Sequence, residues 1–278
     1  MGAVSALSTT SRTLKRNSVL FAIALIITLV SLAPSGISPL LSPPVAWILS
    51  LPLSFLLFFL SPFFLGGLLS MASEGIDGTT RFGTFVAGGK DNYLRLFGAM
   101  VLLAILFGAI AAIVTTGIAV TAVFVIGMNS AGAGGAMVGG AGSLGIVALL
   151  GLLGALVVLL PMFFFQFYGP AVVVSDLGIV DSLKRSAGLV RRNLVSTLGY
   201  SAIIGLVGLV AGVSGAVVSM ASGFNRAGMA SMSSPSPGLG VGFVIAALIV
   251  SVLVSTVVAA FGSVYQVAFY GECLESLD

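Results

Sequence analysis

Four basic side chains lie close together in the sequence and are suited to binding an anionic group: Lys184, Arg185, Arg191 and Arg192. Lysine and arginine bind phosphate groups through charge-assisted hydrogen bonds. At 100° per residue, the apolar residues of segment 179–194 gather on one side, which predicts a basic amphipathic helix. We expect it to lie along the cytoplasmic membrane surface, with its cations among anionic lipid headgroups. The alternative interpretation is that these residues only anchor the segment and fix its orientation.

A second group of polar side chains accompanies two similar motifs, Gln166-Phe167-Tyr168-Gly169 and Ala268-Phe269-Tyr270-Gly271. Its members are Gln166, Tyr168, Gln266 and Tyr270. The two glutamines precede the aromatic residues of their motifs, so we expect them to meet at one end of the molecule and bind a polar group. The two tyrosines are also typical of the aromatic belt at a membrane surface.

Most catalytic chemistry is excluded by composition. The chain has no histidine and one cysteine, which removes histidine-based nucleophilic catalysis, histidine zinc or haem sites, disulfides and CxxC pairs. The eight acidic residues are scattered and form no evident metal site. We therefore expect a protein that is not an enzyme and needs no cofactor. The net charge of +3 indicates membrane orientation more than a nucleic-acid partner.

The elements that must position these residues are membrane spans. Of 278 residues, 58% are hydrophobic and 7% charged, whereas soluble domains carry about 25% charged residues. All charges except Arg226 fall in four zones, at residues 12–16, 74–95, 176–192 and 272–278. The three intervening stretches are each too long for one span of about 20 residues and suit a helical hairpin. The sequence predicts an all-α, polytopic membrane protein with six transmembrane helices.

The turns of the hairpins are marked by proline and glycine. Prolines 34 to 44, a glycine-rich run at 127–143 and a Ser/Pro/Gly-rich run at 222–238 interrupt the three stretches. The predicted helices cover residues 18–33, 45–72, 93–126, 143–174, 194–221 and 239–270. The first also resembles a secretory signal peptide, because basic residues precede an apolar run that ends at Ser31-Leu32-Ala33. Pro34 directly after that site favours a retained helix.

Orientation follows from the basic residues. Ten of the eleven lie in the terminal zone or the two charged loops, and Arg226 alone lies on the other side. Cytoplasmic loops carry the excess of lysine and arginine. The expected location is the cell membrane, multi-pass, with both termini cytoplasmic. Apart from Arg95 at the start of the helix predicted at 93–126, no Asp, Glu, Lys or Arg falls within a predicted span, which disfavours an ion-coupled pump.

Three similar units follow each other along the chain. Aligning Asn17, Asn92 and Asn193 brings Lys15, Lys90 and Arg191 into register two residues upstream. The Phe-Tyr-Gly motifs, with Phe63-Phe64-Leu65-Gly66 in the first unit, close each unit. The sequence thus predicts a single integral membrane domain, 1–278, built from parallel repeats at about 5–73, 80–175 and 180–272, each beginning with a juxtamembrane segment. Chance alignment of apolar sequence is the alternative.

Small residues recur at helical spacing in the predicted fifth helix, where Gly205, Gly208, Gly212 and Gly215 form one stripe. Such stripes let transmembrane helices approach closely, so we expect helix packing there. A pathway lined by these residues is the alternative interpretation.

The segment 180–193, VDSLKRSAGLVRRN, together with the Phe-Tyr-Gly endings, resembles uncharacterised six-helix membrane proteins of archaea, especially haloarchaea. That family is distantly similar to the membrane domain of some glycerophosphodiester phosphodiesterases. The resemblance implies the architecture and no activity.

Three functions are open. The first is a non-enzymatic membrane protein that organises membrane lipids, a protein partner or a homo-oligomer. The second is a permease or exporter subunit for a small or lipid-like solute, which needs a cavity lined by polar residues such as Thr115, Thr116, Gln166 or Gln266. The third, an intramembrane lipid enzyme, lacks histidines and buried carboxylates.

Overall fold

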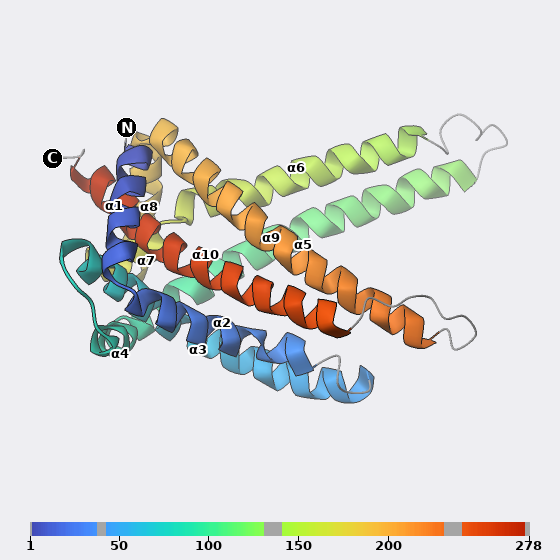
Figure 1. Cartoon of the computed structure of the whole chain (residues 1–278). Coiled ribbons are helices and arrows are strands. Elements are labelled where there is room, and N and C mark those ends of the chain that lie inside the picture. Colours follow the sequence, from blue (N-terminus) through green and yellow to red (C-terminus); the bar gives the residue numbers. More distant parts are fainter. Residues whose placement is uncertain (1, 38–42, 131–140, 231–240, 276–278) are drawn as a thin grey trace.

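The computed structural model describes residues 2–37, 43–130, 141–230 and 241–275, and its regular elements in these ranges are helices (Figure 1). In chain order they are α1 (Gly2–Arg16), α2 (Val19–Ile37), α3 (Pro43–Asp77), α4 (Phe82–Asp91), α5 (Tyr93–Ser130), α6 (Ala141–Phe165), α7 (Tyr168–Val173), α8 (Ile179–Arg192), α9 (Leu194–Ala230) and α10 (Val241–Glu275). The predicted turns at 34–44, 127–143 and 222–238 lie partly outside the described residues, which leave out 38–42, 131–140 and 231–240.

Five spans of the described part are long and apolar enough to cross a membrane. They lie in α3, α5, α6 continued by α7, α9 and α10. The helix α2 meets α1 at 91°, and only this bent pair, taken together, would supply a sixth span. The prediction of an all-α chain is confirmed for the described residues, and the five long apolar helices are consistent with a membrane protein.

The predicted helix 143–174 is broken in the structure, because α6 ends at Phe165 and α7 begins at Tyr168. Proline has no backbone N–H, so Pro170 cannot donate to the carbonyl of Gln166 four residues earlier. The break therefore follows from a proline that lies near the end of an otherwise continuous apolar run. The other long helices extend beyond their predicted ends, α9 as far as Ala230.

The buried core lies at one end of the molecule. Figure 1 shows both chain ends, α1, α4, α7 and α8 gathered there, with the long helices extending away in pairs. Fully buried aromatic side chains at this end include Phe167, Tyr265, Phe269 and Tyr270. The rings of Phe167 and Phe269 stack with centroids 5.3 Å apart, so the motifs that end the second and third predicted units are in contact.

The long apolar helices are mostly exposed outside this core, since at most 17% of any candidate span is buried within the chain. In water such exposure would be unfavourable, but lipid tails are as apolar as these side chains. The arrangement is consistent with a membrane protein whose single-chain core forms at the end that carries the charges.

Each short amphipathic helix packs on a long helix in the same manner. α4 lies against α3, α8 against α6 and α7, and α1 against α10, so the last helix of the chain supports the first. Between hairpins, α3 contacts α5 and α10 contacts α2. The corresponding helices α6 and α9 do not pack along their length in the described part, and Figure 1 shows them diverging.

The three aligned asparagines occupy equivalent junctions between a short helix and a long one. Asn17, Asn92 and Asn193 each donate a side-chain N–H to the carbonyl four residues earlier. The acceptors are the carbonyl oxygens of Thr13, Gly88 and Leu189, at 3.1, 3.0 and 3.3 Å. Each of these carbonyls also accepts the backbone N–H of the same asparagine, at 3.0, 3.3 and 3.0 Å, so the side chain adds a second bond at the end of each short helix.

Close helix contacts occur at glycines of α3 and α4. A Cβ added at Gly67 would lie 2.6 Å from the carbonyl oxygen of Phe85, and one added at Gly88 would collide with Ser70. These glycines allow the backbones of the two helices to approach. The sequence prediction had placed such an approach on α9 instead.

The predicted glycine stripe of α9 is open within the chain. A Cβ added at Gly205, Gly208, Gly212 or Gly215 would meet nothing within 4 Å. α9 turns a different side inward, and Tyr200, Ile203 and Ile204 of that side pack at the buried core. The expected close packing along the stripe is therefore not made inside one chain.

Candidate functional site

Helix α8 carries the predicted basic residues, and the side of it that packs against the rest of the chain is partly polar. Its buried residues are Ser182, Leu183, Ser186, Leu189 and Val190. The prediction of an amphipathic helix is confirmed, but the inward side is rotated from the expected one, because Val180 is 53% exposed while two serines are buried. Ser186 faces inward because it completes hydrogen bonds that the broken helix leaves open, whereas Ser182 donates to the carbonyl of Ile179 in its own helix.

Ser186 supplies both of those bonds. Its hydroxyl donates to the carbonyl of Phe164, at 2.8 Å, and accepts from the backbone N–H of Phe167, at 3.0 Å. Both backbone groups belong to the junction between α6 and α7, where the regular helical pattern is interrupted. This pairing fixes α8 against the end of α6 and sets which residues of α8 face outward.

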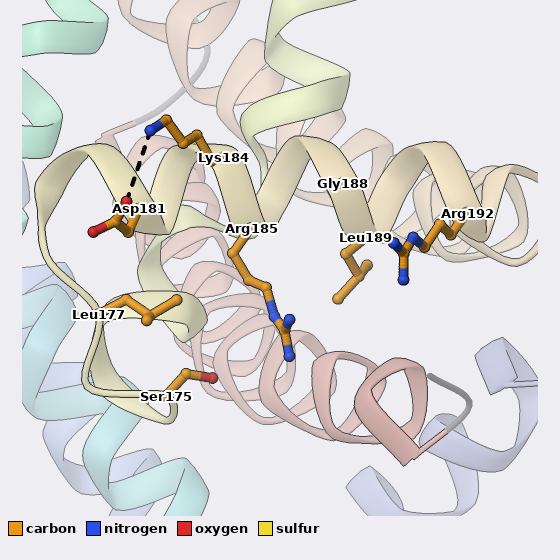
Figure 2. A pocket seen from close by; sticks show the side chains of 8 residues that line it. All are labelled: Ser175, Leu177, Asp181, Lys184, Arg185, Gly188, Leu189 and Arg192. Atoms are coloured by element: carbon orange, nitrogen blue, oxygen red, sulfur yellow. Dashed lines mark ion pairs between the residues drawn. The ribbon is translucent and has the colours of Figure 1, made fainter. Parts of the chain in front are cut away.

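An open pocket of about 580 Å3 lies on the outward side of α8 (Figure 2). Its lining residues from the helix are Asp181, Lys184, Arg185, Gly188, Leu189 and Arg192, and Ser175 and Leu177 come from the preceding connection. Figure 2 shows the side chains of Arg185 and Arg192 on the same side of the helix, with that of Leu189 between them. The pocket thus combines two guanidinium groups, a bare stretch of helix and aliphatic walls.

The charges of the pocket are not balanced. The Nζ atom of Lys184 lies 3.9 Å from Oδ1 of Asp181, and both side chains are largely exposed. Among the described residues, neither Arg185 nor Arg192 has an ion-pair or hydrogen-bond partner. Their unpaired N–H groups favour an anionic ligand.

The wall of the pocket opposite α8 is fixed by contacts with two long helices, α5 and α10. Asp176 adopts a backbone φ of 52°, which non-glycine residues rarely do, and its carboxylate forms an ion pair with Arg95 of α5. The hydroxyl of Ser175 lies 2.7 Å from that of Tyr270 in α10. These contacts give the short connection between α7 and α8 a defined path beside the helix.

Three of the four predicted basic residues of α8 lie at the pocket. Lys184, Arg185 and Arg192 line the pocket, whereas Arg191 is exposed and is not among its lining residues. Sequence reasoning did not identify Ser175, Leu177 or Gly188. The spacing of Asp181, Arg185, Gly188 and Arg192, at i, i+4, i+7 and i+11, is the signal that would have found the outward side of α8.

The two predicted glutamines do meet, and both are engaged in structural hydrogen bonds. The side-chain amide of Gln266 donates to the carbonyl of Gln166 at 2.6 Å, which is the carbonyl that Pro170 leaves unpaired. The Gln166 amide donates to Phe163, and its oxygen accepts from Ser201 at 3.3 Å. These hydrogen bonds therefore join the end of α6 to α9 and α10.

The two tyrosines of the prediction differ in their positions. Tyr270 is fully buried and supports the pocket wall through Ser175. Tyr168 is half-buried at the start of α7, and its hydroxyl makes no hydrogen bond within the described part of the chain. Only Tyr270 is thereby connected to the pocket.

The cavity between α5 and α6 offers little to a polar solute. It measures about 360 Å3 and is lined by Ala111, Val114, Thr115, Gly154, Ala155, Val158 and Leu159. The hydroxyl of Thr115 donates to the carbonyl of Ala111 at 2.7 Å, within its own helix. The pocket beside α8 is thus the better candidate for a functional site. Over the described ranges, no three side chains of the His, Cys, Asp or Glu type gather as metal ligands would.

Comparison with known proteins gives a family and no activity. No curated protein and no solved structure matches the chain significantly. A family model described as a domain of unknown function (DUF7847) matches residues 1–273, and the chain therefore belongs to this family.

Proposed function

We propose that this chain is a non-enzymatic protein of the cell membrane that organises anionic lipid at its cytoplasmic face. The single observation that carries the proposal is the gathering of α1, α4 and α8 at the end of the molecule that holds the charged zones. Amphipathic helices with basic residues bind anionic membrane surfaces, at about 1 kcal/mol per basic residue near the surface. In a second version of the same proposal, the basic helices bind a protein partner or a second copy of the chain at that end.

The proposed topology has six spans, with both termini in the cytoplasm. Five of these spans follow from helix length and composition, and α2 is the proposed sixth. Its residues Leu20 and Ile23 pack within the buried core. The distribution of basic residues supports the orientation. The alternative of a removed signal segment would take away these core contacts.

We further propose that the architecture is a threefold parallel repeat. The equivalent hydrogen bonds of Asn17, Asn92 and Asn193 support it, and so does the packing of each short helix on a long one. The proposed relatives are archaeal membrane proteins and, more distantly, the membrane domain of glycerophosphodiester phosphodiesterases.

The alternative function is a permease or exporter subunit for a small or lipid-like solute. It is less favoured because Gln166 and Gln266 already bond to one another and to neighbouring helices. Thr115, which the alternative needs in a polar cavity, bonds within its own helix. An intramembrane lipid enzyme is the least favoured, since the chain has no histidine and none of the described carboxylates is buried.

The proposal is tested by lipid retention. The purified full chain is placed in nanodiscs that contain phosphatidylglycerol and phosphatidylcholine, and native mass spectrometry records which lipid stays bound after gentle release. We expect phosphatidylglycerol to be enriched. Replacing Lys184, Arg185, Arg191 and Arg192 together by glutamine should reduce that enrichment by tenfold or more. Equal retention of both lipids by the unmodified chain would overturn the proposal.

A further inference from the structure

We infer that the pocket beside α8 is a discrete site for one phosphate group of an anionic glycerophospholipid, held between Arg185 and Arg192. This inference rests on the proposed function and adds a place, a ligand class and a stoichiometry to it. General attraction of a basic helix to a membrane requires none of these.

The first step is the spacing of the two arginines. Seven residues along an α-helix correspond to two turns and a rise of about 10 Å, so both side chains leave the same side of α8. Gly188 lies between them, and a Cβ built there would meet nothing within 4 Å. Both guanidinium side chains line the same pocket, and their N–H groups can donate to the several acceptor oxygens of one phosphate.

The second step concerns which cations are available. Lys184 is paired with Asp181 at one edge of the pocket, and Arg95 is paired with Asp176 in the adjoining connection. Arg185 and Arg192 have no such partner among the residues described. The described residues thus leave two unneutralised arginines lining one pocket, and an anion would bind both.

The third step distinguishes a lipid from a soluble phosphate. Leu177 and Leu189 line the same pocket, and apolar side chains close to α8 are exposed, with Val180 at 53% and Leu194 at 47%. A helix that exposes both apolar and basic residues lies in the headgroup region of a membrane. A phosphate that arrives there carries acyl chains, so the ligand class is an anionic phospholipid.

The decisive experiment compares neighbouring arginines of the same helix. Arg185→Gln and Arg192→Gln remove charges that line the pocket, while Arg191→Gln removes an exposed charge that does not line it. Binding of phosphatidylglycerol is measured for each full-length variant by native mass spectrometry at rising lipid concentration. We expect one tightly bound lipid per chain, weakened about tenfold or more by the two pocket variants and less than threefold by the control.

A fourth variant leaves the charge unchanged. Gly188→Leu places a side chain into open space on the floor of the pocket, so the helix is expected to fold normally while the phosphate is displaced. Thermal aggregation of each variant checks that folding is intact. If Arg191→Gln weakens binding as much as Arg185→Gln, or if Gly188→Leu binds the lipid normally, the discrete site is overturned. The proposed function would survive either result, because the unmodified chain would still prefer the anionic lipid.

Soluble ligands separate the two sources of phosphate. Inorganic phosphate at millimolar concentration should compete with the lipid only weakly, because it lacks the acyl chains that reach the apolar surface. Tighter binding of inorganic phosphate than of short-chain phosphatidylglycerol at the same pocket would overturn the lipid assignment.

Discussion

The hydroxyl oxygens of Ser175 and Tyr270 lie 2.7 Å apart and join the connection before α8 to the end of α10. Tyr270 is fully buried, whereas Ser175 is half-buried and lines the candidate lipid pocket. One wall of the pocket therefore depends on a helix that is distant in sequence. Stability measurements on this pair report on that dependence.

Replacing Ser175 by alanine should cost more than replacing Tyr270 by phenylalanine. Ser175→Ala leaves the buried tyrosine hydroxyl without its partner, at about 1–3 kcal/mol, while Tyr270→Phe leaves a serine that can still bind water. Unfolding in a detergent titration measures both changes and the double variant. We expect the double variant to be less destabilised than the sum. Strict additivity would show that the hydrogen bond contributes nothing.

Gln266 acts in place of the backbone donor that Pro170 lacks. Gln266→Met should destabilise the chain by about 1–3 kcal/mol, because the Gln166 carbonyl loses its 2.6 Å bond. Adding Pro170→Ala restores a backbone N–H to that turn, so it should recover part of the loss in the same detergent titration. A double variant no more stable than Gln266→Met alone would contradict this explanation of the helix break.

The junction between α6 and α7 could be predicted from the sequence only in part. The repeated Phe-Tyr-Gly motifs correctly predicted that Gln166 and Gln266 would meet. Their use as structural donors and acceptors could not be predicted, because it depends on which carbonyl a proline leaves free and on which helix lies beside it. The break at residues 166–167 was missed for the same reason, since apolar periodicity continues across it.

The pocket was predictable on one side only. The spacing of charged residues gave the amphipathic character of α8, but its inward side depends on the bonds of Ser186 to another helix. The second wall depends on Arg95 of α5, which pairs with Asp176 at the other end of the same hairpin. Contacts between distant segments of this kind leave no periodic signal in the sequence.

Glycine substitutions should separate the real close contact from the predicted one. Gly67→Ala brings a methyl group to within 2.6 Å of the Phe85 carbonyl oxygen, so we expect a loss of about 1–3 kcal/mol. Gly208→Ala meets nothing within 4 Å and should be neutral or slightly stabilising. Thermal aggregation in detergent ranks the two variants. A larger loss for Gly208→Ala would place a contact of another chain on that stripe.

The equivalent asparagines should differ in their contribution to stability. Asn17 also donates to the carbonyls of Gly75 and Gly78 and accepts from the N–H of Thr80, while the side chain of Asn193 makes only its local bond among the described residues. Asn17→Ala should therefore cost at least about 1–3 kcal/mol and Asn193→Ala less than about 1 kcal/mol. Asn92→Ala, which also removes a local side-chain bond, serves as the control. Equal losses for Asn17→Ala and Asn193→Ala would contradict this assignment.

The orientation in the membrane can be tested with introduced cysteines. Cys273 is only 3% exposed, so its own thiol is a poor reporter and is first replaced by serine. Thr79→Cys lies at an exposed position at the end that carries ten of the eleven basic residues, and Ser233→Cys lies in a predicted turn on the other side. Because basic residues stay in the cytoplasm, a membrane-impermeant thiol reagent should label Ser233→Cys in intact cells and Thr79→Cys only after lysis. Labelling of Thr79→Cys in intact cells would reverse the orientation and place the α8 pocket on the outer face.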